Sequence, residues 1–294
     1  MRIGVIGGSG FYRLESLKNA ESVRVTTPFG NPSDEYLVGK LKGREVVFLP
    51  RHGRGHTIMP SEINHRANIY GMKKLGVERI VSFSAVGSFK EELRPCDLVL
   101  PDQYFDRTKQ SDRHTFFGGG IVAHIPFSEP ACPDLRRVMA RSVRRTIERL
   151  GLQNERRVQE GGTYVNMEGP AFSTRAESLY YKSLGFDVIG MTSLAEAKLC
   201  REAEICYQAL AMVTDYDCWH VSEAPVTVEM IMSNLKANSL MAAEIILDLA
   251  AEVPAAENCS CRSALKNAIV TDPALIPADR KKELALITGR YIGA

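Results

Sequence analysis

Short apolar, β-branched runs alternate with helical patterns along most of the chain, and this alternation limits the folds open to it. The runs typical of strands occupy residues 2–7, 45–50, 79–88, 97–101, 187–191 and 205–217. The helical patterns occupy residues 64–76, 134–151, 174–185, 194–204 and about 227–252. Buried strands that alternate with helices indicate a mostly parallel or mixed sheet. We therefore predict an α/β fold with a central mixed β-sheet flanked by helices on both faces.

The chain of 294 residues is predicted to form a single domain. It has no repeat period, no low-complexity tract and no linker that clearly separates two units. Residues 262–294 are expected to form a C-terminal helical segment. Their sequence leaves open whether this segment caps a pocket or serves as an interface.

The composition is that of an ordinary soluble globular protein, with 45% hydrophobic and 24% charged residues. A formal net charge of +2 gives no reason to expect nucleic acid, membranes or acidic partners. The sequence contains neither a long apolar run nor a signal-peptide pattern at its start, so we expect a cytoplasmic protein. The arginine-rich helix at 134–151 lacks base-reading partners and is interpreted as a solvated surface.

Seven cysteines are present, and only Cys259 and Cys261 form a close step in the sequence. A zinc site needs more ligands at recognisable spacing, so no metal is expected. The favoured interpretation is free thiols that pack as small apolar groups, with disulfides or a redox pair as the alternative. The sequence does not decide between them.

Two glycine-rich segments are candidates for functional loops. The first, "VIGGSGFY", lacks the third glycine of a dinucleotide fingerprint, because that position is Arg13, and it also lacks a P-loop lysine. What remains is a turn that can present the Ser9 hydroxyl and backbone amides to one phosphate. The second, residues 106–120, is polar and ends in three glycines, which predicts a mobile loop.

The stretch "AMVTDYDCW" ends an apolar run on Asp215 and Asp217. Side chains two apart on a strand point to the same side, so the two carboxylates should share one face. Their mutual repulsion should raise one of the two pKa values. Taken alone, a solvated strand end explains this pair better than a catalytic site does.

Other strand ends carry groups that suit a bound anion or ring. Arg51 and His52 follow a strand in "LPRHGRGH" and would make a compact oxyanion site, although a basic surface turn is equally compatible. "SFSAVGS" offers Ser84 and the Ala85 amide, which close strand packing also explains. In "NMEGPAFSTRAES", Phe172 can stack on a flat ring and Ser173 or Thr174 can cap the next helix.

These motifs, together with "GMTS", occur in an order and spacing that resemble the purine nucleoside phosphorylase superfamily. More narrowly, residues 1 to about 250 are similar to its trimeric-type branch that cleaves S-methyl-5'-thioadenosine. The resemblance implies phosphorolysis to adenine and 5-methylthioribose 1-phosphate. Inorganic phosphate would be a co-substrate, with no metal or other cofactor. It also implies a homotrimer or homohexamer.

The resemblance assigns roles to matching residues. The implied phosphate site comprises Ser9, Arg51, His52, Ser84, Ala85 and Thr192. The implied nucleoside site comprises Phe172, Ser173 and Met191, with Val228, Ile231 and Met232 at the 5' group. His124 would reach the site of a neighbouring subunit. One departure is Ala195, where many relatives have proline, which leaves the local helix start open.

The expected reaction would use the two aspartates to protonate and recognise the leaving base. Departing adenine must be protonated or hydrogen-bonded at N7, and an aspartate with a raised pKa can supply that proton. Asp215 is predicted at N7, with Asp217 at the 6-amino group, which favours a 6-aminopurine. The alternatives are a purine nucleoside or methylthioinosine phosphorylase, a nucleosidase that uses water, and a nucleoside-binding sensor without catalysis.

Overall fold

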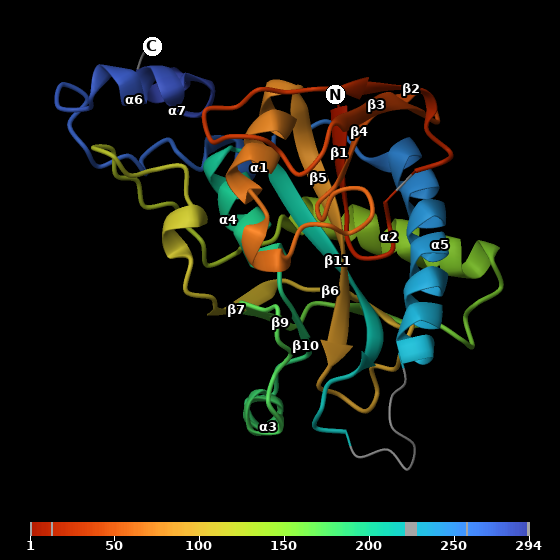
Figure 1. Cartoon of the computed structure of the whole chain (residues 1–294). Coiled ribbons are helices and arrows are strands. Elements are labelled where there is room, and N and C mark those ends of the chain that lie inside the picture. Colours follow the sequence, from red (N-terminus) through yellow and green to blue (C-terminus); the bar gives the residue numbers. More distant parts are fainter. Residues whose placement is uncertain (1, 13, 221–227, 257, 293–294) are drawn as a thin grey trace.

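The fold is built on an eleven-stranded mixed sheet with helices on both faces (Figure 1). The computed structural model describes all residues except 1, 13, 221–227, 257 and 293–294, and it leaves out the side chains at 228 and 231. The strands are β1 (Arg2–Gly7), β2 (Lys18–Val23), β3 (Tyr36–Leu41), β4 (Arg44–Pro50), β5 (Val77–Ser88), β6 (Leu98–Leu100), β7 (Gln103–Arg107), β8 (Val158–Glu160), β9 (Thr163–Met167), β10 (Val188–Gly190) and β11 (Cys206–Tyr216). The predicted α/β class is confirmed.

The described helices cover both faces of this sheet. They are α1 (His65–Lys74), α2 (Pro133–Arg149), α3 (Arg175–Ser183), α4 (Ser193–Glu202), α5 (Val228–Glu252), α6 (Ala278–Glu283) and α7 (Ala285–Ile292). Helices α2 and α5 bury their apolar sides against one face, whereas α1, α4 and the C-terminal segment pack on the other. None of the described helices is both long and apolar enough to span a lipid bilayer.

Strands β4, β1, β5 and β11 lie side by side and run parallel. Their carboxyl ends therefore meet at one edge of the sheet, where ligands bind in open α/β folds. Strand β10 runs antiparallel to β5, with Ile189 opposite Gly87. The chain that follows β10 therefore runs back along β5. Its first residues lie at the same edge of the sheet as the carboxyl ends of the parallel strands.

The sequence predicted the strands with continuous apolar runs but missed five others. Strand β2 is exposed along most of its length and has no apolar alternation, and β3, β7, β8 and β9 are short or mixed in character. The five helices expected from the sequence are all present within a few residues of their predicted bounds.

The prediction of a mobile loop at 106–120 was wrong for residues 115–117, which are held against the core. Phe116 is completely buried and Phe117 nearly so, within the apolar cluster beside α1 and α4. The Glu202 carboxylate accepts hydrogen bonds from the Thr115 hydroxyl at 2.6 Å and the Phe116 amide at 2.7 Å. The two aromatic side chains and the buried carboxylate hold the segment against the core.

The C-terminal segment lies on the face of the sheet that carries α1 and α4. Leu265, Ile276, Leu284 and Ile287 are buried in the apolar cluster on that face. Figure 1 shows α6 and α7 at the end of the molecule opposite α3. The described part of the segment contributes no residue to the main cavity, so it does not cap that cavity within this chain.

Candidate active site

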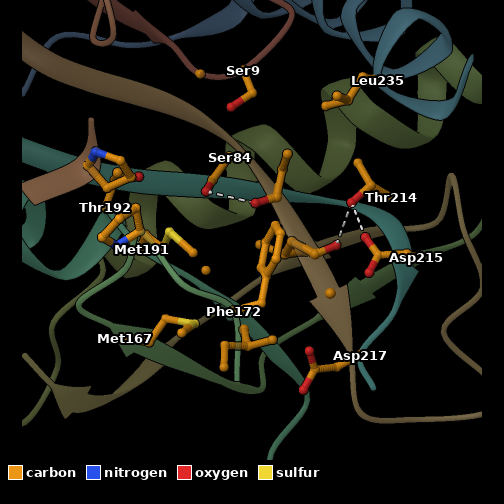
Figure 2. Close-up of a pocket in the computed structure, with 18 of the residues that line it drawn as sticks. Ser9, Ser84, Met167, Phe172, Met191, Thr192, Thr214, Asp215, Asp217 and Leu235 are labelled. Carbon is orange, nitrogen blue, oxygen red and sulfur yellow. Dashed lines mark hydrogen bonds between the residues drawn. The ribbon is translucent and has the colours of Figure 1, made fainter. Parts of the chain in front are cut away.

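A cavity of about 860 Å³ opens where the carboxyl ends of the parallel strands meet. Figure 2 shows its side chains converging from the β1, β5 and β11 strand ends, from the loops around Met191 and Phe172, and from α5. The predicted site residues that line it are Ser9, Arg51, His52, Ser84, Ala85, Phe172, Met191, Thr192, Asp215 and Asp217. Segments far apart in the sequence therefore contribute to one site.

Arg51 follows β4 and is almost completely buried, with 1% of its surface exposed. Its Nη2 donates to the Ser82 hydroxyl at 2.9 Å and to the Phe83 carbonyl, and its Nη1 donates to the Thr192 hydroxyl. Nη1 also lies 3.2 Å from the Glu196 carboxylate. The guanidinium is thus fixed in place by partners on β5 and at the start of α4.

These partners leave few of the Arg51 donors for a bound oxyanion, and the predicted place of Arg51 in the phosphate site stays a prediction. Protein acceptors already engage both terminal nitrogens, and Glu196 offsets the positive charge. Only Nε has no hydrogen-bond partner among the described residues. Arg51 therefore holds the Ser82 and Thr192 hydroxyls in place, and its Nε remains available as a donor.

His52 lies beside Arg51 and is also buried. Burial, and then the neighbouring Arg51 charge, lower the pKa of His52 to about 4. The ring is therefore neutral at neutral pH. Its Nδ1 lies 2.9 Å from the Ile58 carbonyl, which can only accept, so the proton is on Nδ1. Nε2 is left as an acceptor, suited to a hydroxyl on a protonated phosphate or a sugar.

Hydroxyl groups and a tight glycine turn complete this end of the cavity. Ser84 shares a 3.0 Å hydrogen bond with the buried Tyr164 hydroxyl, and Thr192 stands at the N-terminus of α4. A Cβ at Gly8 would lie 2.3 Å from the Phe83 carbonyl oxygen, so only glycine allows β1 to approach β5 there. That approach places Ser9 on the cavity wall.

Asp215 occupies the opposite end of the cavity, near the end of β11 (Figure 2). Burial raises the pKa of its carboxyl to about 6, and the negative charge of Asp217 adds to the increase. A hydrogen bond from the Thr214 hydroxyl at 2.5 Å limits the rise. With a pKa of about 6, roughly a tenth of the molecules carry a proton on Asp215 at pH 7.

Asp217 lies just beyond β11, and burial raises the pKa of its carboxyl as well. One of its oxygens, Oδ2, has no hydrogen-bond partner among the described residues. The register shift in the pairing with β5 falls between Val213 and Asp215 and therefore precedes both aspartates. Both carboxylates line the same cavity, as the predicted shared face requires.

Phe172 is the most exposed large apolar side chain at the site, with 81% of its surface accessible. Its ring stands in the middle of the group of lining residues in Figure 2, between the two ends already described. The loop that carries it ends at α3, where Thr174 forms a capping box with Glu177. Thr174, rather than Ser173, is therefore the cap that the sequence left open.

Several predicted residues do not line the cavity of this chain. Ser173 is half-buried and its hydroxyl faces the Met167 sulfur at 3.9 Å, whereas Met232 is 59% exposed on α5. His124 is exposed, and its backbone amide donates to Ala268 at 2.8 Å. The side chains of Val228 and Ile231 lie outside the described part of the structure. Their predicted roles stay predictions.

Sequence reasoning missed residues that support the site from behind. Glu196 accepts hydrogen bonds from the Ser82 and Tyr207 hydroxyls at 2.6 and 2.8 Å, in addition to its ion pair with Arg51. Leu235, from the next turns of α5, lines the cavity near Ser9 (Figure 2). An acidic residue in the first turn of a helix usually indicates only a favourable helix start. No local sequence pattern indicated that Glu196 pairs with Arg51, which follows β4.

Comparison with known proteins agrees with this geometry. The family model described as the phosphorylase superfamily matches residues 2–251. A protein of Geobacter sulfurreducens named S-methyl-5'-thioadenosine phosphorylase is 54% identical over 290 residues, which cover 99% of each chain. A Koribacter versatilis protein of the same name is also 54% identical, over 99% of this chain and 97% of its own.

Solved structures show the same relationship. A methylthioadenosine phosphorylase from an antarctic soil metagenomic library has a TM-score of 0.88 and 44% identity, over 97% of this chain and 98% of its own. The Schistosoma mansoni methylthioadenosine phosphorylase in complex with adenine has a TM-score of 0.78 and 37% identity, over 85% and 91%. This chain therefore belongs to the phosphorylase superfamily, within the family of S-methyl-5'-thioadenosine phosphorylases.

Proposed function

We propose that the protein cleaves S-methyl-5'-thioadenosine with inorganic phosphate to adenine and 5-methylthioribose 1-phosphate. The observation that carries this proposal is one cavity with a proton-donating end and an anion-binding end. Asp215 and Asp217 stand at the first, and Arg51, His52 and Thr192 stand at the second. The relatives of the same family name support the choice of substrate.

Breaking the glycosidic bond builds negative charge on the leaving base and positive charge on the sugar. A protonated Asp215 would donate to N7 of adenine as that charge develops. The free Oδ2 of Asp217 would accept from the 6-amino group. A 6-oxopurine presents an acceptor there, which a carboxylate would repel, so the pair supports a 6-aminopurine substrate.

Phosphate would bind among the hydroxyls of Ser9, Ser84 and Thr192, near the start of α4. Helix N-termini and hydroxyl donors favour an anion, and exclusion of water strengthens each contact. His52 Nε2, as an acceptor, would take a hydrogen bond from the protonated phosphate oxygen. In this scheme phosphate is the only co-substrate, and no cofactor is needed at the cavity.

Phe172 and Met191 would hold the purine and the ribose, and the methylthio group would lie toward α5. Leu235 gives that wall an apolar surface. A thioether needs no hydrogen-bond partner at this wall. The 5'-hydroxyl of adenosine would give up its hydrogen bonds to water there and find no protein partner in their place. The substrate preference should therefore favour the thioether over the hydroxyl.

A panel of nucleosides tests the substrate assignment. Initial rates would be measured with S-methyl-5'-thioadenosine, adenosine, methylthioinosine and inosine at saturating phosphate. We expect the highest kcat/KM for S-methyl-5'-thioadenosine. Faster cleavage of inosine or methylthioinosine would contradict the proposal that Asp215 and Asp217 select a 6-aminopurine. A protein that binds the nucleosides without cleaving any would be a sensor, and the proposal would be wrong.

We also propose that the active form is a homotrimer or a homohexamer whose subunits complete one another's sites. His124 is exposed and outside its own cavity, and Val122, two residues before it, is 45% exposed and accepts a hydrogen bond from the Val270 amide. Mixing His124→Ala and Asp215→Asn subunits after unfolding and refolding should regenerate some intact sites. Recovery of activity above that of either variant would support shared sites, and no recovery would contradict them.

A further inference from the structure

Four buried cysteines meet at one point far from the main cavity. They are Cys132, Cys206, Cys259 and Cys261, and their sulfur atoms all lie within 4.8 Å of one another. The Cys132 and Cys259 sulfurs are 3.5 Å apart. Four thiolates around one tetrahedral zinc ion, with Zn–S bonds of about 2.3 Å, lie about 3.8 Å apart, so the spacing suits a single shared cation.

Three separate elements carry these sulfurs. Cys132 caps the N-terminus of α2, and its amide donates to the Tyr207 carbonyl at 2.8 Å, which ties it to the start of β11. Cys206 is the first residue of β11. Cys259 and Cys261 flank the start of the short 3₁₀ helix Ser260–Ser263 that follows α5. Ligands from three elements thus converge without any contiguous zinc motif.

The surroundings favour negative charge at this point. The Leu135 amide points at the Cys132 sulfur at 3.5 Å, and the positive end of the α2 dipole stabilises a thiolate there. Arg79 lies opposite Cys206 in the β5–β11 pairing and borders the same surface hollow as Cys259. It is 2% exposed, and its Nε and Nη1 have no hydrogen-bond partner among the described residues.

We propose that Cys132, Cys206, Cys259 and Cys261 form a structural tetrathiolate zinc site. A zinc ion with four thiolates carries a net charge of −2, which the buried Arg79 cation offsets. Two disulfides would be neutral and would leave that cation without a counter-charge, which is costly in a protein interior. A set of four sulfur ligands also suits zinc better than harder cations.

The position of the site explains what the ion would do. Cys259 and Cys261 belong to the apolar cluster on the face of the sheet that α5 covers. Leu265, four residues further along the chain, belongs to the cluster on the other face. The ion would fasten the chain where it crosses between the two faces. Cys206 and Asp215 lie nine residues apart on β11, about 30 Å at a strand's usual rise, so the ion would take no part in cleavage.

Metal content and thiol counting test the proposal directly. Protein expressed with zinc in the medium and purified without chelator or reductant should carry one zinc per chain. Denaturation with a chelator should then expose all seven cysteines to a thiol reagent. Cobalt exchanged into the site should give the intense visible absorption of tetrahedral cobalt thiolates. Chelation of the intact protein should lower its Tm.

A matched pair of variants keeps the test specific. Cys259→Ala with Cys261→Ala should lose the zinc, whereas Cys200→Ala, at an equally buried cysteine outside the cluster, should keep it. If the double variant does not fold, Cys261→Ala alone should bind zinc more weakly. Absence of zinc from the wild-type protein with only three reactive thiols would mean two disulfides and overturn the proposal. Seven thiols without zinc, or iron in its place, would overturn it as well.

Discussion

Arg51 and Glu196 lie 3.2 Å apart at the back of the cavity, and each side chain is at most 2% exposed. Arg51 directly follows β4, and Glu196 lies in the first turn of α4. A buried ion pair is weak proof of stability in itself, but removal of one partner leaves an uncompensated charge. The pair therefore fixes the geometry of the anion-binding end.

Glu196→Gln should destabilise the protein and weaken phosphate binding. Breaking a buried ion pair on one side costs about 3–5 kcal/mol. Glutamine has a single acceptor oxygen, so it cannot accept from Arg51 and from the Ser82 and Tyr207 hydroxyls as the carboxylate does, and the KM for phosphate should rise. Denaturant unfolding and steady-state kinetics measure the two effects. The control is Glu78→Gln, from a half-exposed pair with Arg262, which should cost less than about 1 kcal/mol.

Asp215→Asn should lower kcat by about 10²–10⁴-fold, the usual contribution of a general acid. An amide cannot supply the proton, but it fills the same space, so the KM for phosphate should change little. Asp279→Asn, an exposed change at the start of α6, serves as the control. Unchanged kcat in Asp215→Asn would remove Asp215 from the mechanism.

The raised pKa of Asp215 predicts a pH-dependent difference in stability. The folded state holds the proton more tightly than the unfolded state, with a pKa of about 6 against 3.8. Its contribution is fully present below pH 3.8 and is lost as the pH rises through 6. The Tm of Asp215→Asn should therefore rise relative to the wild type between these values. A constant difference across this range would contradict the buried, protonated carboxyl.

Gly8→Ala should disturb the anion-binding end through the backbone. The added Cβ would lie 2.3 Å from the Phe83 carbonyl oxygen, so β1 and β5 must separate. Overpacking of this kind costs about 1–3 kcal/mol, and the KM for phosphate should increase. Gly289→Ala is the matched change, because its Cβ would meet nothing within 4 Å. Equal thermal stability of the two variants would contradict the close approach.

The sequence predicted the features that depend on local pattern. Apolar runs predicted the parallel strands, and strand alternation predicted that Asp215 and Asp217 share a face, in agreement with the cavity that both line. Ser9, Arg51 and Thr192 were assigned through the family resemblance, and the structure places all three on the cavity wall. Their individual roles stay predictions.

What the sequence could not predict depends on distant partners. Glu196 meets Arg51 across 145 positions of the chain, and no local pattern marks that pairing. Cys132 and Cys206 join Cys259 and Cys261 only because β11 and α2 bring them together. The burial of Phe116 shows the same limit, since flanking glycines suggested a free loop. Each case required tertiary packing.

Phosphate dependence is the most direct test of the proposed reaction. Adenine release from S-methyl-5'-thioadenosine would be followed in the presence and absence of inorganic phosphate, together with analysis of the sugar product. We predict that release requires phosphate and yields one 5-methylthioribose 1-phosphate for each adenine. Release at the same rate without phosphate, with free methylthioribose as the product, would show a hydrolase and contradict the role given to the anion-binding end.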